Sequence, residues 1–338
     1  MTDKVSSSTI KKILSELWEN AIFDPQTYKI VEKIAEEQKI PEKLLPDIYY
    51  ELNTLRNRNL INSSQQSKLR RCVAGFFGLS VGSHAAVTWA MESRADVIKI
   101  ADPDVISPSN LNRLKAGWNS VGIEKTKVVF KQIHSMNPNA HIITSTQTKT
   151  LLGIKKLFDQ KPKLDIVVDE VDDLSAKVWL RRLANERNIP LISATDVGDG
   201  ATIDIERYDK RPKPEPFLGR ALDLDIENTD FSELPLKERV KLTMQIVGFE
   251  ACSEEMLDSL LSIGKTLKTW PQLGATASIA GGIIATAIKK IILGENVESG
   301  RYYISLDKLL VKDYDSPARK TQRDEKIKEF KRKFGILR

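Results

Sequence analysis

The chain of 338 residues is poor in side chains that cross-link proteins or bind transition metals. Its two cysteines, Cys72 and Cys252, exclude both a disulfide framework and a four-cysteine zinc site. The three histidines are scattered without the regular spacing of metal ligands, so we expect them to be structural. Cys72 opens the apolar run Cys72-Val-Ala-Gly-Phe-Phe77, which predicts a buried strand and a packing role for this thiol.

The sequence also lacks an obvious membrane segment. Its longest weakly polar run, residues 273–288, is shorter than the roughly 20 residues of a membrane span and is closed by Lys289 and Lys290. The small residues of this run favour a buried core helix whose backbone lies close to a neighbouring element. Met1 to Thr9 contain no secretory apolar segment. We therefore expect a cytoplasmic protein without a membrane contact.

The excess of positive charge is concentrated at the C-terminal end of the sequence. The net charge is +6, and residues 319–338 hold nine basic residues against three acidic ones, which accounts for the whole excess. A solvated basic helix over 319–333 is the simplest interpretation, and no zinc-finger, RNA-recognition or helix-turn-helix pattern accompanies it. At 41% hydrophobic and 29% charged, the chain has the composition of an ordinary globular protein, and we expect no nucleic-acid partner.

Alternating strand and helix patterns dominate the middle of the chain. This alternation predicts an α/β fold, a Rossmann-like, mostly parallel sheet with helices on both faces. The predicted strands are 71–77, 97–102, 141–147, 164–171 and 190–195. The helices between them are predicted at 83–93, 122–136, 150–159 and 173–188.

The two ends of the chain have different patterns. Helices are predicted at 8–18, 27–38 and 41–58, followed by a polar joint at 62–67. After the sheet, 201–208 alternates as a half-exposed antiparallel strand does, and the proline-rich stretch 209–235 predicts a mobile lid or crossover. Further helices are predicted at 235–246, 253–263 and 274–293, with a strand at 301–306.

A glycine turn and an acidic residue form the first candidate site. Gly78-Leu-Ser-Val-Gly-Ser83 lies between a predicted strand and helix, where helix amides can hold a phosphate. Asp102 ends the next strand, at the distance from Gly82 where a Rossmann unit holds a ribose hydroxyl. Such turns are common in any α/β fold, but the acid behind this one favours nucleotide binding.

Further polar candidates follow two of the predicted strands, the strand 97–102 and the strand 164–171. The cluster Ser109-Asn-Leu-Asn-Arg113 suggests phosphate chemistry, and Lys125 could contact the same nucleotide, although a lysine there could equally face solvent. Asp172 and Asp173 end the strand near 164–171, where carboxylates face the ligand crevice and can hold Mg²⁺ with substrate phosphates. The alternative for either is capping of the following helix, and Asp172 is the stronger candidate for a ligand.

These motifs together resemble the ThiF/MoeB/ubiquitin-activating-enzyme superfamily of adenylyltransferases. The resemblance covers about residues 56–207 and, less distinctly, 270–294. It implies that ATP is used to adenylate a carboxylate, usually the C-terminus of a ubiquitin-like or sulfur-carrier protein. The motifs that carry it are the glycine turn, Asp102-Pro-Asp-Val, Ser109-Asn-Leu-Asn-Arg113, Gly122-x-x-Lys125, Asn137-Pro138 and Val171-Asp-Asp173.

The resemblance implies a role for each matching residue. Asp102 would bind the ribose of ATP, Asn110, Arg113 and Lys125 its phosphates, and Asp172 the Mg²⁺. Arg58 lies in Arg56-Asn-Arg-Asn-Leu-Ile61, which is similar to a family element whose arginine reaches the γ-phosphate of a partner subunit. Arg58 would then act in trans within a homodimer, unless it is simply a solvated helix end. The implied adenylation sites include these residues: Gly78, Gly82, Asp102, Asn110, Arg113, Lys125, Asp172, Asp173 and Arg58.

The chain departs from the family pattern in two ways. Ser80 and Val81 stand where glycines are common, a variant turn that could crowd the phosphates. The paired Cys-x-x-Cys elements of many relatives are missing, so we expect no structural zinc. Cys252 could occupy the place of a thioester-forming cysteine, but a structural role is the stronger interpretation, since Glu254 and Glu255 would oppose a thiolate.

The predicted organisation follows from the resemblance. An N-terminal helical segment (1–66) precedes a nucleotide-binding domain (67–208), then a crossover loop and C-terminal α+β part of the same adenylation domain (209–318), then a basic tail (319–338). The alternative function is a non-catalytic family member that acts as a structural or regulatory partner of an active subunit. An NAD-dependent oxidoreductase would leave Arg113 and Lys125 without a role.

Overall fold

The computed structural model describes residues 29, 45–220, 231, 234–263 and 265–335. The chain divides into two units, residues 1–67 and 68–338. In the first unit, helix α3 (Leu45–Asn53) and a short 3₁₀ turn (Leu55–Asn57) fall within the predicted helix 41–58. The predicted helices 8–18 and 27–38 lie outside the described residues, apart from Lys29. Helix α4 (Ser63–Arg71) runs across the boundary and leads into the first strand.

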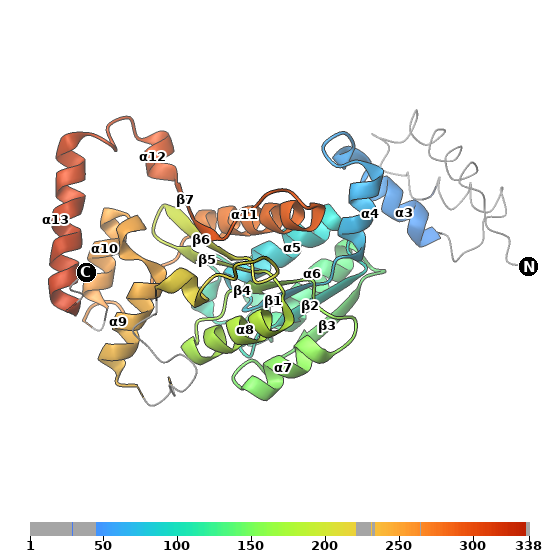
Figure 1. The fold of residues 1–338 in the computed structure, drawn as a ribbon, viewed down its shortest axis with the longest axis horizontal. Coiled ribbons are helices and arrows are strands. Elements are labelled where there is room, and N and C mark those ends of the chain that lie inside the picture. The colour runs from blue at the N-terminus through green and yellow to red at the C-terminus, as the bar shows by residue number, and fades with distance from the viewer. Residues whose placement is uncertain (1–28, 30–44, 221–230, 232–233, 264, 336–338) are drawn as a thin grey trace, which may run out of the picture. The chain divides into compact units, whose positions relative to one another are not determined.

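The second unit is built on a seven-stranded mixed sheet (Figure 1). The strand order is β3-β2-β1-β4-β5-β6-β7, with β1 to β5 parallel and β6 and β7 antiparallel. The predicted α/β fold is confirmed. The strands are β1 (Ala74–Phe77), β2 (Val97–Ala101), β3 (His141–Ser145), β4 (Ile166–Asp169), β5 (Leu191–Asp196), β6 (Gly200–Glu206) and β7 (Gly300–Ser305).

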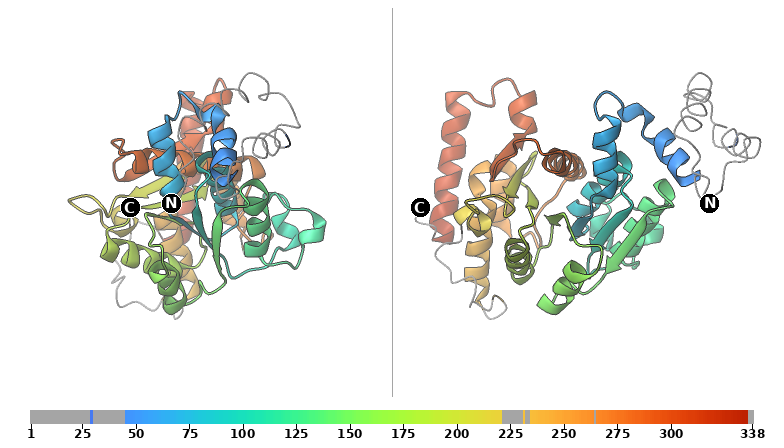
Figure 2. Two further views of the ribbon diagram at one scale, coloured as in Figure 1. Left: turned by 90° about the vertical axis from the view of Figure 1, so that its right-hand side faces the viewer. Right: turned by 45° about the vertical axis from the view of Figure 1, so that its right-hand side comes forward.

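Helices cover both faces of the parallel part, which explains why its strands are continuously apolar (Figures 1 and 2). One face carries α5 (Val81–Ser93), α6 (Lys125–Met136) and α11 (Gly274–Leu293), and the other carries α7 (Leu151–Asp159) and α8 (Leu174–Arg187). On the α7/α8 face, the rings of Phe77 and Phe158 pack with centroids 5.5 Å apart.

The register of the strands sets the position of the site. Phe77 is paired with Ala101 of β2 and with Asp169 of β4. The residues that follow these three positions are Gly78, Asp102 and Glu170, so the glycine turn and both acids leave the sheet at the same edge. The carboxyl ends of parallel strands are where open α/β sheets bind their ligands.

Helix α11 is the apolar run of the sequence, extended to 20 residues. It continues through Lys289 and Lys290, and by length and composition it could cross a membrane, although half of its most apolar window is buried. It packs on α5 so closely that a Cβ on Gly281 would lie 2.5 Å from Cβ of His84. The close backbone approach predicted from the small residues is therefore confirmed, and the packing is that of a core helix.

The C-terminal part adds a second apolar core. It contains α9 (Leu236–Val247), α10 (Glu254–Ser262), α12 (Leu306–Leu310) and α13 (Pro317–Phe334). The basic tail is helical from Pro317, but it is not solvated on all sides, because Phe330 is fully buried with its ring centroid 5.4 Å from that of Phe249. The predicted helix is thus present, but it is exposed to solvent on one side only.

Candidate active site

The glycine turn joins β1 to α5 and depends on both of its glycines. Gly78 has φ +88°, and a Cβ there would clash with the carbonyl group of Glu170. A Cβ on Gly82 would lie 3.2 Å from both Cβ and Cγ of Glu170. Helix α5 begins at Val81, and its N-cap residue Ser80 makes no side-chain capping bond. Among the described residues the first amides of this helix therefore lack a side-chain cap, as at helix termini that bind anions.

Asp102 fastens this turn to the end of β2. Its two carboxylate oxygens accept hydrogen bonds from the backbone N–H groups of Leu79 at 2.6 Å and Asp104 at 2.8 Å. Burial raises the pKa of Asp102, although the nearby Lys125 ammonium and these two N–H groups oppose that effect. The residue is 3% exposed and lines the pocket described below. Its predicted contact with a ribose stays a prediction.

Lys125 does not face solvent. It begins α6, and its side chain is 9% exposed. Its Nζ lies 3.1 Å from Oδ2 of Asp104 and 3.5 Å from Asp102. These two carboxylates hold the ammonium at the pocket.

Arg113 is held by the turn residue that departs from the family pattern. Its Nε donates to Oγ of Ser80 at 3.0 Å, and Nη1 donates at 3.0 Å to both the Ser109 carbonyl oxygen and Oδ1 of Asn112. Burial lowers the pKa of Arg113, while the charges of Asp172 and Asp196 oppose this. Ser80 therefore positions the arginine.

Asn110 has a local role in the same segment. It ends the 3₁₀ turn Pro108–Asn110, and its Oδ1 accepts a hydrogen bond from the Ser107 N–H at 3.0 Å. The predicted phosphate contact of Asn110 stays a prediction.

The two acids after β4 have different environments. Asp173 is the N-cap of α8, and its carboxylate accepts from the Ala176 N–H at 2.8 Å, which is the capping alternative considered above. Both acids are exposed and line the pocket, but only Asp173 caps the helix. Of the pair, Asp172 is therefore the one whose position suits a ligand.

A pocket of about 190 Å³ brings most of the predicted site together. Arg113 borders it through Ser80. The lining residues are Gly78, Ser80, Asp102, Pro103, Asp104, Lys125, Thr148, Lys149, Glu170, Val171, Asp172, Asp173 and Ala176. A second cavity, between β3 and α7, contains none of the predicted site residues.

Magnesium fits this donor set in one respect. Mg²⁺ in nucleotide sites is usually held by one or two carboxylates together with substrate phosphates, and the exposed carboxylate of Asp172 meets that requirement. No cluster of three or more acidic, histidine or cysteine ligands occurs in the described part of the chain. A bound metal would therefore depend on the phosphates of the nucleotide.

Sequence reasoning missed Glu170. It is 9% exposed, and its Oε1 accepts from the Ala194 N–H at 2.7 Å. Burial raises the pKa of Glu170 well above its ordinary value, against the effect of Lys177 and the Ala194 N–H. The signal in the sequence is an acid directly after the strand, two residues before Asp172 in the run Asp169-Glu-Val-Asp-Asp173.

Asp196 was also missed. It ends β5, is 2% exposed, and its Oδ2 accepts from Nε2 of Gln272 at 3.3 Å. Within the described residues its Oδ1 has no hydrogen-bond partner. Burial raises the pKa of Asp196 to about 6, although Gln272 and Arg113 favour the charged form.

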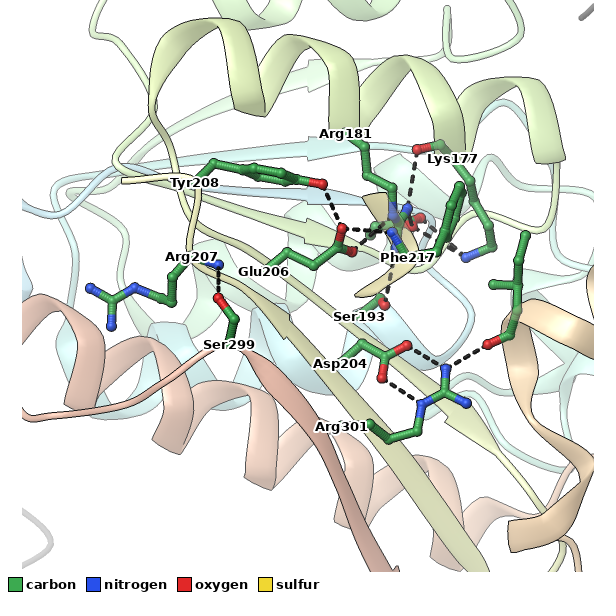
Figure 3. Close-up of polar contacts among 12 residues, drawn as sticks. Lys177, Arg181, Ser193, Asp204, Glu206, Arg207, Tyr208, Phe217, Ser299 and Arg301 are labelled. Atoms are coloured by element: carbon green, nitrogen blue, oxygen red, sulfur yellow. Dashed lines mark hydrogen bonds and ion pairs between the residues drawn. The ribbon is translucent and has the colours of Figure 1, made fainter. Parts of the chain in front are cut away.

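A buried ion network around Arg181 and Glu206 (Figure 3) includes Asp169, the last residue of β4 before the turn that carries Glu170 and Asp172. Arg181 of α8 reaches Asp169 with Nη1 at 2.6 Å and Glu206 of β6 with Nε at 2.8 Å. Burial raises the pKa of Asp169, but Lys177 and Arg181 outweigh it and the pKa is lowered. The carboxylate at the end of β4 is therefore ionised and fixed.

The same network fastens the start of the predicted crossover. Glu206 accepts from the Phe217 N–H at 2.9 Å, and the guanidinium of Arg181 lies 3.9 Å from the centroid of the Phe217 ring (Figure 3). Phe217 has φ +56°, which costs energy for a bulky residue and is held here by these contacts. Residues 221–230 of the crossover lie outside the described part of the chain.

Arg58 and Cys252 remain to be placed. Arg58 belongs to the first unit, where its Nη2 lies 3.2 Å from Oε2 of Glu51, and its action in trans stays a prediction. Cys252 is 3% exposed in the second core, and burial together with Glu250 raises the pKa of its thiol to about 12. Such a thiol is inert at neutral pH, as a structural cysteine is.

Comparison with known sequences identifies the family. A family model described as the ThiF family matches residues 54–327. Uncharacterized protein MT1398 of Mycobacterium tuberculosis (strain CDC 1551 / Oshkosh) is 32% identical over 255 residues, which are 75% of this chain and 35% of that protein. The tRNA threonylcarbamoyladenosine dehydratase of Bacillus subtilis (strain 168) is 30% identical over 141 residues, 41% of this chain and 54% of that protein. The chain thus spans about a third to a half of these curated relatives.

Solved structures share the fold at low identity. The crystal structure of PaaA matches with a TM-score of 0.52 and 17% identity, covering 90% of this chain and 96% of that one. The crystal structure of E. coli MccB also matches with a TM-score of 0.52 and 17% identity, covering 88% and 81%. The family model covers most of the chain, and the chain therefore belongs to the ThiF family.

Proposed function

We propose that the protein uses ATP to activate a carboxylate as an acyl-adenylate. The observation that carries this proposal is the single pocket into which the glycine turn, Asp102, Lys125 and Asp172 converge, with Arg113 beside it. A curated relative, from Meyerozyma guilliermondii, is described as adenylyltransferase and sulfurtransferase UBA4 and is 26% identical over 153 residues. Family membership and the cationic groups at a nucleotide-type edge support the same conclusion.

The reaction we propose is an in-line displacement at the α-phosphorus of ATP. An oxygen of the substrate carboxylate forms the new P–O bond as the bond to the bridging oxygen breaks, and pyrophosphate leaves with the electron pair. No proton transfer is needed. Arg113 and Lys125 would neutralise the charge that develops, and their fixed positions supply orientation. Mg²⁺ held by Asp172 and the phosphates would add Lewis-acid stabilisation.

The substrate and assembly belong to the same proposal. We propose the C-terminus of a ubiquitin-like or sulfur-carrier protein as the carboxylate, and a cytoplasmic homodimer in which Arg58 reaches the partner's site. An enzyme of this kind needs little covalent participation from the protein, so the buried Cys252 is not required for adenylation.

Exchange of pyrophosphate into ATP tests the activity. Small carrier proteins and short peptides with free C-termini would serve as the carboxylates. We expect Lys125→Ala to lower the exchange rate by about 100-fold or more, because it removes a charge aimed at the phosphates. Lys127→Ala is the matched control, since Lys127 lies two residues further on α6 in an exposed pair with Glu124 at 3.0 Å. A folded Asp172→Ala variant that retains full exchange would contradict the role of Asp172.

A non-catalytic role is the second candidate. Ser80 and Val81 favoured it in the sequence, because side chains in the turn could exclude phosphates. The bond from Arg113 to Ser80 weakens that argument, since the serine has a use in the site. Calorimetry with ATP separates the two: a folded protein that binds no ATP supports the non-catalytic role.

A further inference from the structure

One of the three histidines is buried beside the glycine turn, with a polar contact at each ring nitrogen. His84 lies in the first turn of α5 and is 4% exposed, whereas His134 and His141 are exposed. Its Nε2 lies 2.5 Å from the carbonyl oxygen of Arg113, and its Nδ1 lies 3.3 Å from Oγ of Ser278 on α11. The adenylation proposed above uses no histidine, so these contacts still need an explanation.

The partner at Nε2 determines where the imidazole carries its proton. A carbonyl oxygen can only accept a hydrogen bond, so Nε2 of His84 is the donor to Arg113. Burial lowers the pKa of His84, and the charge of Lys115 acts in the same direction, although the bond to the carbonyl opposes them. At neutral pH the ring is therefore neutral, with its hydrogen on Nε2 and the lone pair of Nδ1 towards Ser278.

Ser80 and His84 hold the two ends of the same arginine. They are four residues apart at the start of α5, a spacing that places side chains on one side of a helix. Ser80 accepts from Nε of Arg113 at 3.0 Å, and His84 donates to its carbonyl oxygen. The Arg113 N–H donates to the Asn110 carbonyl oxygen at 3.1 Å. The guanidinium and both main-chain groups of Arg113 are thus held.

Helix α11 packs closely on the same group of residues. A Cβ on Gly281 would lie 2.5 Å from Cβ of His84. A Cβ on Gly274 would lie 2.7 Å from the carbonyl oxygen of Asn112 and 3.6 Å from Cα of Arg113. A shift of the imidazole away from Arg113 would therefore have to displace α11.

The arginine that is held in this way stands at the border of the nucleotide pocket. Ser80 and Asp172 both line that pocket. Arg113 binds Ser80 directly, and its charge interacts with that of Asp172. A cation that is fixed before the ligand arrives loses little conformational freedom on binding.

Building on the proposed adenylation, we propose that His84 is the residue that positions Arg113 for the phosphates of ATP. The imidazole acts through its Nε2–H bond to the main chain and does not touch the nucleotide or transfer a proton to it. Removal of this donor would release the Arg113 carbonyl and loosen the guanidinium. A donor at the same place that cannot ionise would keep Arg113 in position.

Calorimetry with ATP and Mg²⁺ tests this role. His84→Leu removes the donor and keeps an apolar side chain, and we expect ATP binding to weaken by about fivefold, the usual worth of one hydrogen bond. His84→Gln has an amide N–H that can reach the same carbonyl, so its ATP affinity should stay within about twofold of the wild type. His134→Leu is the matched control, an exposed histidine on α6, and should not change the affinity.

Double variants show whether His84 acts through Arg113. In the Arg113→Ala protein, His84→Leu should weaken ATP binding by less than about twofold more, because the arginine is already missing. In the Lys125→Ala protein it should keep its full effect of about fivefold, since Lys125 is held by Asp102 and Asp104. A general disturbance of the pocket would cause the same loss in both backgrounds.

The ring tautomer can be measured in the wild-type protein. Nitrogen-15 chemical shifts distinguish the Nε2–H, Nδ1–H and doubly protonated forms of imidazole, and the chain has only three histidines to assign. We expect His84 to be in the Nε2–H form at pH 7.5. The Nδ1–H form would mean that His84 does not donate to Arg113, and it would overturn the inference.

The other outcomes separate the inference from the function on which it rests. ATP binding as weak in His84→Gln as in His84→Leu overturns the positioning role, as does an equal further loss in the Arg113→Ala and Lys125→Ala backgrounds. Both results leave the proposed adenylation intact. If His84→Leu does not fold, His84→Gln and the ring tautomer decide. A folded wild-type protein that binds no ATP contradicts the proposed function, and the inference fails with it.

Discussion

Burial makes the ionisation of Asp196 unfavourable in the folded protein. Its pKa is raised from 3.8 to about 6, with burial as the largest cause. A carboxyl group whose pKa is higher in the folded state binds its proton more tightly there. Its contribution to stability is therefore present at low pH and is lost as the pH rises from about 4 to about 6.

The Asp196→Asn variant should remove this pH dependence. Near pH 4 both proteins carry a neutral group, so their free energies of unfolding should be close. Above pH 6 the wild type must keep a buried charge, and the variant should be more stable by about 3 kcal/mol, roughly two pKa units at about 1.36 kcal/mol each. Urea unfolding at pH 4, 5, 6 and 7.5 measures the difference. A difference that is the same at every pH would show that the carboxyl of Asp196 does not titrate in this range.

Ser80 makes a second prediction at the residue scale. Ser80→Ala removes the hydrogen bond to Nε of Arg113, a charge-assisted bond worth about 1.5 kcal/mol, so ATP affinity or exchange should fall by about tenfold. Thr88→Ala, further along the same helix, is the control, since it also removes a hydroxyl group but Thr88 is not among the residues that line the pocket. Activity that rises in Ser80→Ala would instead show that the serine crowds the phosphates.

Helices and strands of the second unit were predictable because their signals are local. The apolar runs that became β1, β2, β4 and β5 are buried on both faces, and a parallel sheet requires that pattern. The tail helix was predicted from its composition, but its buried face was not. Phe330 is a single aromatic residue in a charged stretch, and only the position of Phe249 makes it a core residue.

The contact between α5 and α11 gives a prediction at the scale of elements. Gly281→Ala should destabilise the protein by about 1–3 kcal/mol, because the new methyl group meets Cβ of His84 at 2.5 Å. Gly282→Ala is the matched control on the same helix, where nothing lies within 4 Å, and it should stabilise by about 0.5–1 kcal/mol. Thermal unfolding of both variants measures the pair. Equal effects would mean that the two helices do not approach closely at Gly281.

The candidate site was only partly predictable because it depends on contacts between distant segments. Asp102, Arg113 and Lys125 lie in motifs with readable spacing, and they border one pocket. Glu170 and Asp196 carry no such motif, since their environment arises from the pairing of β4 with β5 and from Gln272, 76 residues after Asp196. The sequence around Arg181 likewise gives no sign that this arginine is buried, because its partner Glu206 lies on the distant strand β6.

The proposed dimer gives the prediction at the scale of the whole molecule. Arg58→Ala and Asp172→Ala should each be inactive alone, but mixed dimers should recover activity. One site of each mixed dimer has its own Asp172 and the Arg58 of the other subunit, so random mixing in equal amounts should restore about a quarter of the wild-type sites. Exchange activity after co-expression measures this. No recovery despite mixed dimers would place Arg58 outside the site in trans.

Helix α11 connects the glycine turn with the end of β5. Its close approach to α5 fixes the helix that begins at the glycine turn, and the segment just before it supplies Gln272, the partner of Asp196. This helix thus fixes the positions of the glycine turn and of Asp196 relative to each other before any ligand arrives. A site preorganised in this way loses little conformational entropy on binding, so more of its interaction energy goes into orienting the two reactants.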